Sequence, residues 1–399
     1  MKGTLPLTLT ASLMAVAMNA SLAAQEVDLT IKPAADQALR YTISSKSAID
    51  RQNETLVNGE APNFGGGGGR GGRGGFGGAN GTTKIDTTLV FDEGREGSQT
   101  WRAYQKAEST VETPGADGEA NEQTIQGGLV GKKIFLSEDD GGIVAREGSA
   151  KGEDLPVQMT RGLPVVTSFA GLTPDKTIAV GGEFEISASF PKALKSLMHP
   201  VRPEAAGGGG GRRNRGGDDQ GGGGQGRGQG RGGRGGFGRG APTDAALEAI
   251  ANDKLTCKGA GKLVSVEEKD GAQLATVSFN ATLSGKGTPT ALGLNALGGG
   301  RGGFGRGGGR GGRGGRGGGG ATDQEDTGKA EAQVDVKGTM VIDVATHTLR
   351  ELKLEGKMKT NSHTERTFER GGEEMDIEST ATAEGTFEVT VTCEQAPKK

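Results

Sequence analysis

Apolar and polar residues alternate one by one near the end of this chain. In EMDIESTATAEGTFEVTVTCE (374–394), the odd positions from Met375 to Cys393 carry apolar or small side chains, and every even position is Asp, Glu or Thr. A period of two places successive side chains on opposite faces of a β-strand. The stretch therefore predicts a long antiparallel strand with one buried face and one solvated face.

The same alternation predicts further strands. Residues 332–344 and 352–358 read as a hairpin around a turn at 345–348, and residues 275–283 form another strand. Five more strands are predicted upstream, in KIDTTLVFDE (84–93), SQTWRAYQKAEST (98–110), GKKIFLS (131–137), GGIVARE (141–147) and GEFEISASF (182–190). Helical patterns are confined to 191–198 and 242–254. The fold class is therefore all-β with minor α: an antiparallel, strongly twisted sheet, arranged as a half-barrel or a sandwich.

Two short motifs raise the question of an internal duplication. TLVFD (88–92) parallels TMVID (339–343), and a glycine-rich tract precedes each. Under duplication, the two tracts would occupy equivalent loops. The alternative is chance similarity, because all strands draw on the same few residue types.

Composition separates three tracts from the rest of the chain. Residues 65–78, 207–240 and 298–320 hold 48 Gly and 14 Arg in 71 residues, and each contains GGRGGFG. Such stretches have little apolar surface to bury and much backbone entropy to lose, so they are expected to be disordered. They carry a net charge of +12, whereas the chain without them and without residues 1–24 carries −16.

The N-terminus has the order of a secretory signal peptide. Residues 1–24 run from one charged residue, Lys2, through an uncharged apolar stretch to Ser21-Leu22-Ala23-Ala24. A membrane anchor is the alternative, but Pro6 and several Thr interrupt the short apolar core. No transmembrane segment is expected later in the chain. The protein is therefore expected to be exported to the periplasm, the cell envelope or the extracellular space.

These observations divide the chain into four parts. Residues 1–24 are the signal peptide, and 25–200 form an N-terminal β-rich half that contains the first tract. Residues 201–242 form a linker that contains the second tract, and 243–399 form a C-terminal β-rich half that contains the third.

Two stretches carry a family resemblance. LTPDKTIAVGGEFEIS (172–187) and GTMVIDVATHTLRELKLEGKM (338–358) resemble an uncharacterised family of exported bacterial β-rich proteins. The family has Val-Gly-Asp and Trp where this chain has Val180-Gly181-Gly182 and Phe184. It has a Gly-Arg-Leu turn where this chain has His347-Thr348-Leu349. The resemblance implies the compartment and the fold rather than an activity. A looser likeness is to the open half-barrels that carry lipoproteins across the periplasm, and it rests on architecture alone.

The two cysteines predict a disulfide. Cys257 follows Leu255 at strand spacing, and Cys393 ends the last strand on its apolar face. Disulfides persist in oxidising compartments, so an exported chain with two cysteines favours a Cys257–Cys393 bridge. Two free buried thiols are the alternative.

Catalytic and metal-binding patterns are not evident in the sequence. The three His residues have no spacing typical of metal ligands, and no phosphate loop, nucleophile elbow or CxxC motif occurs. The acidic residues at 138–140 read as a solvated hairpin turn rather than a cation site, and Trp101 reads as a core residue. We therefore expect no enzyme activity, no cofactor and no bound metal.

The tracts carry the chemistry of polyanion binding. Arg supplies charge, paired donors and a flat face for stacking, and Phe supplies rings. Anionic polysaccharide, extracellular nucleic acid or acidic protein surfaces are the expected partners, and the tracts could also bind neighbouring copies of this protein. The candidate binding residues are Arg70, Arg73, Phe76, Arg212, Arg213, Arg215, Arg227, Arg231, Arg234, Phe237, Arg239, Arg301, Phe304, Arg306, Arg310, Arg313 and Arg316. The alternative is that the tracts are passive insertions in tolerant loops.

Two functions follow from this sequence. The first is an exported, non-enzymatic envelope or extracellular scaffold or adhesion protein whose tracts bind polyanions. The second is a periplasmic carrier of lipid or another hydrophobic ligand in a concave half-barrel. A carrier predicts a cavity lined by Met340, Ile342, Leu354 and Phe387 that no helix fills, whereas a sealed core there favours the scaffold.

Overall fold

The computed structural model describes residues 26–397 except 33–36, 62–79, 98, 116–118, 140–141, 156–168, 170, 175, 199–200, 202–254, 293, 295–327 and 371–372. Its strands are β1 (Glu26–Val27), β2 (Leu39–Val57), β3 (Gly81–Glu96), β4 (Gln99–Pro114), β5 (Ala120–Gln126), β6 (Lys133–Asp139), β7 (Gly142–Glu147), β8 (Ile178–Ala179), β9 (Glu183–Glu185), β10 (Thr256–Lys269), β11 (Ala272–Gly287), β12 (Lys329–Asp343), β13 (Thr348–Arg370) and β14 (Glu373–Gln395). The helix α3 spans Phe190–Met198.

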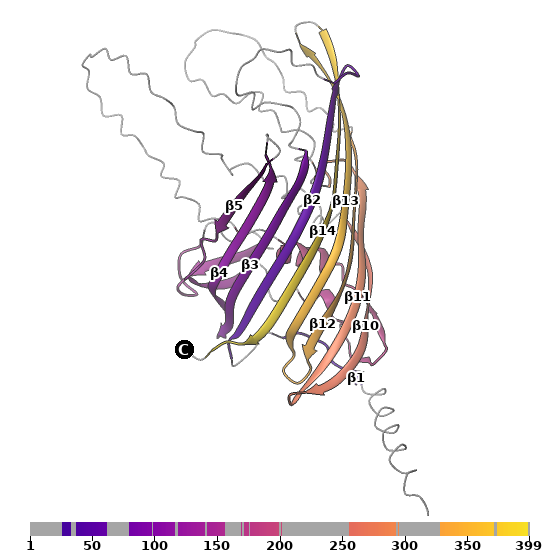
Figure 1. Ribbon diagram of the computed structural model, residues 1–399. Coiled ribbons are helices and arrows are strands. Elements are labelled where there is room, and N and C mark those ends of the chain that lie inside the picture. Colours follow the sequence, from indigo (N-terminus) through magenta and orange to yellow (C-terminus); the bar gives the residue numbers. More distant parts are fainter. Residues whose placement is uncertain are drawn as a thin grey trace, which may run out of the picture.

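Twelve of these strands form one antiparallel sheet that does not close (Figure 1). The order is β7-β6-β4-β3-β2-β14-β13-β12-β11-β10-β9, and β5 pairs with β4 beside this path. β1 and β8 form a separate two-stranded sheet. The last strand, β14, pairs with β2 from Gln395↔Leu39 to Ile377↔Val57, so strands from both halves of the chain share one continuous sheet.

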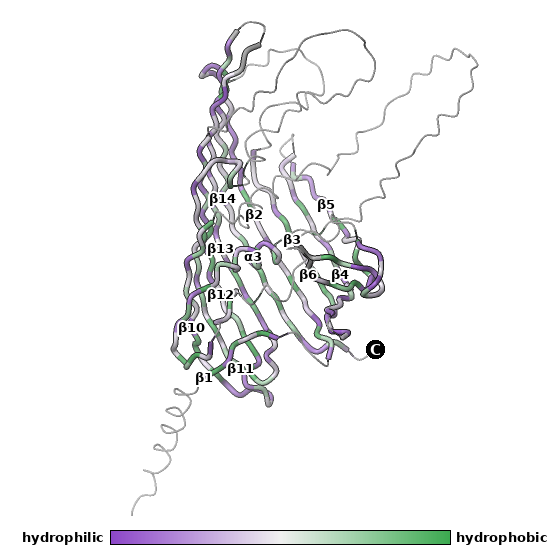
Figure 2. The backbone as a smooth tube through the Cα atoms, turned by 180° about the vertical axis from the view of Figure 1, so that it is seen from behind, coloured by the Kyte–Doolittle hydropathy of each residue, from purple (hydrophilic) through white to green (hydrophobic). Residues whose placement is uncertain are grey.

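One face of the sheet is covered and forms the hydrophobic core. Figure 2, seen from this side, shows α3 lying across the strands, and we call this the inner face. The helix buries Phe190, Leu194, Leu197 and Met198 in the same apolar cluster as the inner-face residues of β10–β14. The Phe190 ring meets the Phe279 ring edge-on, with 6.3 Å between centroids. The opposite, outer face carries the polar half of each alternating strand.

Glycines opposite aromatic residues recur on the strands. Gly356 pairs directly with Phe387, and a Cβ at Gly356 would come within 2.3 Å of that ring. Gly338 with Phe279 and Gly261 with Phe184 repeat the arrangement. In each pair the ring occupies the space that a side chain at the glycine position would need. Glycines in strands permit close approach and sharp bending, and neighbouring rings restore the lost packing.

The motifs TLVFD and TMVID occupy similar places in β3 and β12. Each contains a register shift, between Val90 and Phe91 in β3 and between Val341 and Ile342 in β12. Each ends in a buried aspartate that binds arginine: Asp92 accepts from Arg40 at 2.8 Å, and Asp343 pairs with Arg350. The two motifs therefore share a bulge and an ion pair as well as a sequence.

The predicted antiparallel β fold is confirmed, with a single open sheet in place of a sandwich. The predicted hairpin corresponds to β12 and β13, and the helix expected at 191–198 is α3. The strand expected at 182–190 is shorter than predicted, because only Glu183–Glu185 pair and Phe190 already begins α3. The helix predicted at 242–254 lies outside the described residues.

Candidate functional site

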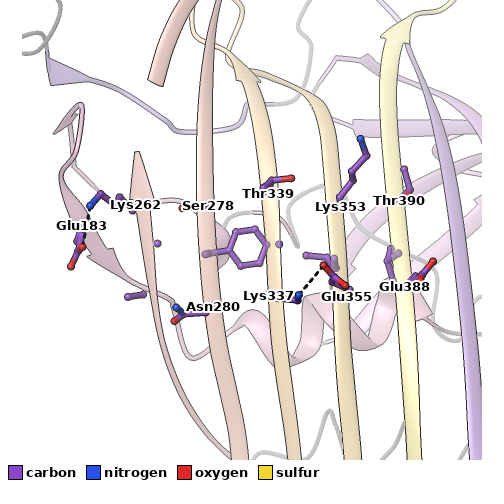
Figure 3. Close-up of a pocket in the computed structure, with 16 residues that line it drawn as sticks. Glu183, Lys262, Ser278, Asn280, Lys337, Thr339, Lys353, Glu355, Glu388 and Thr390 are labelled. Atoms are coloured by element: carbon purple, nitrogen blue, oxygen red, sulfur yellow. Dashed lines mark ion pairs between the residues drawn. The ribbon is translucent and has the colours of Figure 1, made fainter. Parts of the chain in front are cut away.

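A broad trough lies on the outer face of the described part of the sheet. Three adjoining hollows of about 900, 500 and 610 Å³ lie over β10–β14 and the edges of β9, β2 and β3. The first two share Asn280, Lys337, Glu355 and Glu388, so they form one continuous depression. We call this depression the outer trough. Figure 3 shows side chains of five adjacent strands around its largest part, together with Glu183 of β9.

Strand register explains which residues line the outer trough. Opposite residues on neighbouring antiparallel strands lie on the same face, so each row across the sheet is fixed by pairing. One row runs from Lys262 through Ser278, Thr339 and Lys353 to Thr390. The trough is therefore lined by hydroxyl groups and by charged side chains at strand spacing.

Charges of both signs line the outer trough. Lys337 pairs with Glu355 at 3.2 Å, and Lys262 pairs with Glu183 at 3.6 Å (Figure 3). Glu355 also stands directly opposite Glu388, which places two carboxylates side by side. All four paired side chains are more than half exposed. Such pairs contribute little to stability but give the surface many hydrogen-bonding groups. The arrangement suits reversible contact with an extended polar chain.

A buried polar network lies on the inner face, at the end of the sheet opposite the hairpin tip of β13 and β14. Arg102 donates to Glu93 at 2.6 Å, and its guanidinium lies 4.7 Å from the centre of the Phe91 ring. Burial raises the pKa of Tyr104, and the neighbouring Arg102 opposes this rise. Because Arg102 and Glu93 are both buried, removing either partner would leave an uncompensated charge. The network contributes to the core and does not open onto the outer trough.

The described residues next to the first and third tracts lie at one end of the sheet. The first lies between Ala61 and Asn80, between β2 and β3, and the third lies between Leu294 and Gly328, between β11 and β12. Register connects these sites, because Gly81 pairs with Arg51 and the same row continues through β14, β13 and β12 to Gly285. We call this end of the sheet the tract end.

The second tract re-enters the sheet at the same end. Leu255 is the first described residue after it, and the next residue, Thr256, pairs with Ser284 one row from Gly285. The described residue before this tract lies elsewhere. The Val201 backbone N–H donates to the Ser109 hydroxyl of β4 at 2.8 Å, and Ser109 pairs with Thr87, six residues along β3 from Gly81. The seventeen predicted Arg and Phe binding residues themselves lie outside the described residues, so their predicted role stays a prediction.

The predicted disulfide is wrong in this structure, because Cys257 and Cys393 are both free thiols. Register shows why. The row that contains Cys257 passes through Leu283, Val334 and Met358 to Gly385, and Cys393 lies eight residues further along β14. Eight residues of strand span about 26 Å, and four interstrand steps add about 19 Å across the sheet. A disulfide requires Cα atoms within about 7 Å.

The structure also places His347 and Trp101, for which the sequence predicted a turn and a core position. His347 lies in the turn between β12 and β13 with a φ of 52°, as expected. Trp101 is not a core residue: it is only half-buried and lies on the outer face, where the Lys133 ammonium sits 4.7 Å from its ring centre. Within the described part of the chain, no cluster of three or more His, Cys, Asp or Glu is placed to hold a metal ion.

The outer trough was not identified from the sequence. Alternation in the strands indicates which of its residues face outward, but only the pairing of β9 through β14 brings them into one depression. Among the residues that the structure describes, no helix has the length and apolar character needed to cross a membrane.

Comparison with known proteins yields little. No protein-family model matches the chain, and no curated protein matches it. A crystal structure of OpdQ from Pseudomonas aeruginosa aligns over 90% of this chain and 97% of its own length, at 9% identity and a TM-score of 0.17. A TM-score this low carries no argument about fold or function. The assignment of function therefore depends on the chain's own sequence and geometry.

Proposed function

We propose that this protein is an exported, non-enzymatic scaffold or adhesion component of the cell envelope or extracellular space, and that its three Arg/Gly tracts bind polyanions. The observation that carries the proposal is that each tract has at least one described flanking residue at the tract end. From β3 to β10 the sheet has six interstrand steps, or about 29 Å. Tracts of 14 to 34 residues attached within this width can contact one polymer together.

Common attachment strengthens weak binding. Each tract alone offers a few Arg residues, but binding of one raises the effective concentration of the others at the same polymer. The tracts carry +12 and the rest of the mature chain −16. Attachment at one end therefore concentrates positive charge there and leaves the acidic sheet behind it, which favours end-on binding to a polyanion.

The covered inner face favours a scaffold over a carrier. Met340, Ile342, Leu354 and Phe387, which would line a carrier's cavity, are between 0% and 2% exposed. They belong to the same cluster as α3, so the chain itself occupies the place of a hydrophobic ligand. A lipid copurifying in stoichiometric amount, detected by mass spectrometry of the intact protein, would favour the carrier instead.

The test is the salt dependence of polyanion binding by the full-length mature protein. Affinity for heparin and for single-stranded DNA should fall steeply with salt, because each neutralised charge releases counterions. Deleting 65–78, 207–240 and 298–320 should abolish binding. Replacing the tract Arg residues by Lys is the matched control: the salt dependence should remain while affinity falls, since Lys lacks the planar, two-pronged donor.

Two results would contradict the proposal. Polyanion binding that survives deletion of all three tracts would place the binding site on the sheet. No detectable binding at low salt would make the tracts passive insertions.

A further inference from the structure

Among the residues that the structure describes, none covers the outer edge of β5, whereas the edges of β7 and β10 are covered. At one end, β7 is covered by residues 153–155, with the Leu155 N–H donating to the Ala145 carbonyl at 2.8 Å. At the other end, β10 is covered by β9 and flanking residues, with the Gly181 N–H donating to the Leu263 carbonyl at 2.7 Å. On β5, no backbone hydrogen bond to its far side occurs among the described residues.

β5 is also open to solvent on both faces. Six of its seven residues are exposed, and Ile125 alone is partly buried. Native sheets usually protect an edge with Lys, Pro, a bulge or a covering loop. The strand ANEQTIQ has no Lys or Pro, and its pairing with β4 has no register shift. It is therefore a ready template for another strand.

The hydrogen bonds that flank β5 show which of its residues face outward. The Gly127 N–H donates to Ala107 at 2.8 Å, and the Gly115 N–H donates to Glu119 at 2.9 Å. In an antiparallel pair, bonded and non-bonded residue pairs alternate, so the odd-numbered residues of β5 bond to β4. The even-numbered residues then direct their N–H and C=O groups away from the sheet. These are Ala120, Glu122, Thr124 and Gln126.

We propose that β5 pairs antiparallel with β5 of a second copy of this chain, with the two-fold axis at Gln123. This register places Glu122 opposite Thr124 and Ala120 opposite Gln126 of the other copy, so every outward N–H and C=O group finds a partner. A shift that placed Glu122 opposite itself would oppose like charges. The proposal goes beyond the proposed function, and it joins two sheets edge to edge by β-strand addition.

Self-complementarity is what favours a second copy over an unrelated strand. An isologous contact requires that one surface match itself about a two-fold axis. β5 meets this requirement because its single charge, Glu122, faces an uncharged residue and its outward groups are equally spaced. The strand offers little apolar area, so we expect association in the micromolar range or weaker.

Cysteine cross-linking of the full-length mature protein tests the register. In the proposed dimer, the two Gln123 residues form a non-bonded pair with Cα atoms about 4.5 Å apart, which suits a disulfide. Gln123→Cys should therefore form a covalent dimer under mild oxidation. Gln126→Cys is the matched control on the same exposed strand, because its two copies would lie about 20 Å apart. Equal cross-linking of both variants, or of neither, would overturn the proposal.

Charge substitution at the opposing position gives a second test, by sedimentation velocity over a range of concentrations. Thr124→Lys would place a lysine opposite Glu122 twice across the axis, so dimer affinity should rise severalfold and become salt-sensitive. Thr124→Glu should lower it severalfold. Circular dichroism would show that both variants stay folded. The proposal would be wrong if the protein stayed monomeric at every concentration of a series that reaches well above the micromolar range. It would also be wrong if neither substitution changed the affinity of the dimer.

Discussion

The two cysteines show how far individual residues could be interpreted from sequence. Alternation correctly placed Cys393 on the buried face of its strand, and this follows from local geometry alone. The disulfide required the distance between two strands, which depends on sheet order and register. Neither is encoded locally. Arg102 and Glu93 were missed for the same reason, because a buried ion pair between β3 and β4 is visible only once their pairing is known.

The first residue-scale prediction concerns thiol reactivity. Burial raises the pKa of Cys393 to about 11, and Cys257 is only partly buried. At pH 8, Cys257 should react with an alkylating reagent much faster than Cys393, since thiolate fraction and access both favour it. Peptide mapping after brief labelling would check this. A peptide that joins the two cysteines, found without reductant, would contradict the free thiols.

Strands with a conventional alternation were predicted well, and strands without one were missed. β2 is 19 residues long, yet its inner positions include Ser45, Arg51 and Asn53, so polar residues occupy both faces. β5 has almost no apolar residue. β2 buries Leu39, Tyr41, Ile43 and Ile49, but the polar residues between and after them interrupt the pattern. β5 has no such buried face, so its pairing with β4 provides its stability. The pattern of hydrophobicity therefore predicts burial more reliably than it predicts strands.

At the level of the strand, we predict that glycine–aromatic pairs are needed for stability. Gly356→Ala should lower the free energy of unfolding by about 1–3 kcal/mol, because the new methyl group would meet the Phe387 ring and the backbone oxygen of Asp335. Gly287→Ala is the control, since a Cβ there makes only ordinary contacts at 3.6 Å or more. Urea unfolding measures both. If Gly356→Ala and Gly287→Ala were equally stable, the close packing of Gly356 against Phe387 would not contribute to stability.

At the scale of the whole molecule, the order of the strands in the sheet could not be predicted from the sequence. The antiparallel class and most hairpins follow from neighbouring segments. The junction of β2 with β14 joins residues more than 300 positions apart, and nothing in either strand names the other as its partner. Composition divides the chain into two β-rich halves, and the structure places strands of both in one sheet.

One continuous sheet predicts one cooperative unfolding transition. Trp101, the only Trp, lies in β4, whereas Leu283 lies in β11, six strands away in the sheet. Leu283→Ala should cost about 2–5 kcal/mol and should shift the fluorescence transition of Trp101 by that amount. Leu89→Ala, in the strand next to β4, is the local control. If Leu283→Ala left the unfolding transition of Trp101 fluorescence unchanged, the two halves would unfold independently.

The pairing of β2 with β14 also fixes an order of events during synthesis. β2 is made early, but its central partner, β14, extends to Gln395, more than 300 residues later. The other neighbour of β2 is β3, which follows the first tract. β3 is therefore the only partner available to β2 until β14 has been made. Contacts this distant in sequence form slowly. The nascent chain therefore lacks the seam at the middle of its sheet until β14 has been made, and a protein truncated before β14 could never acquire it.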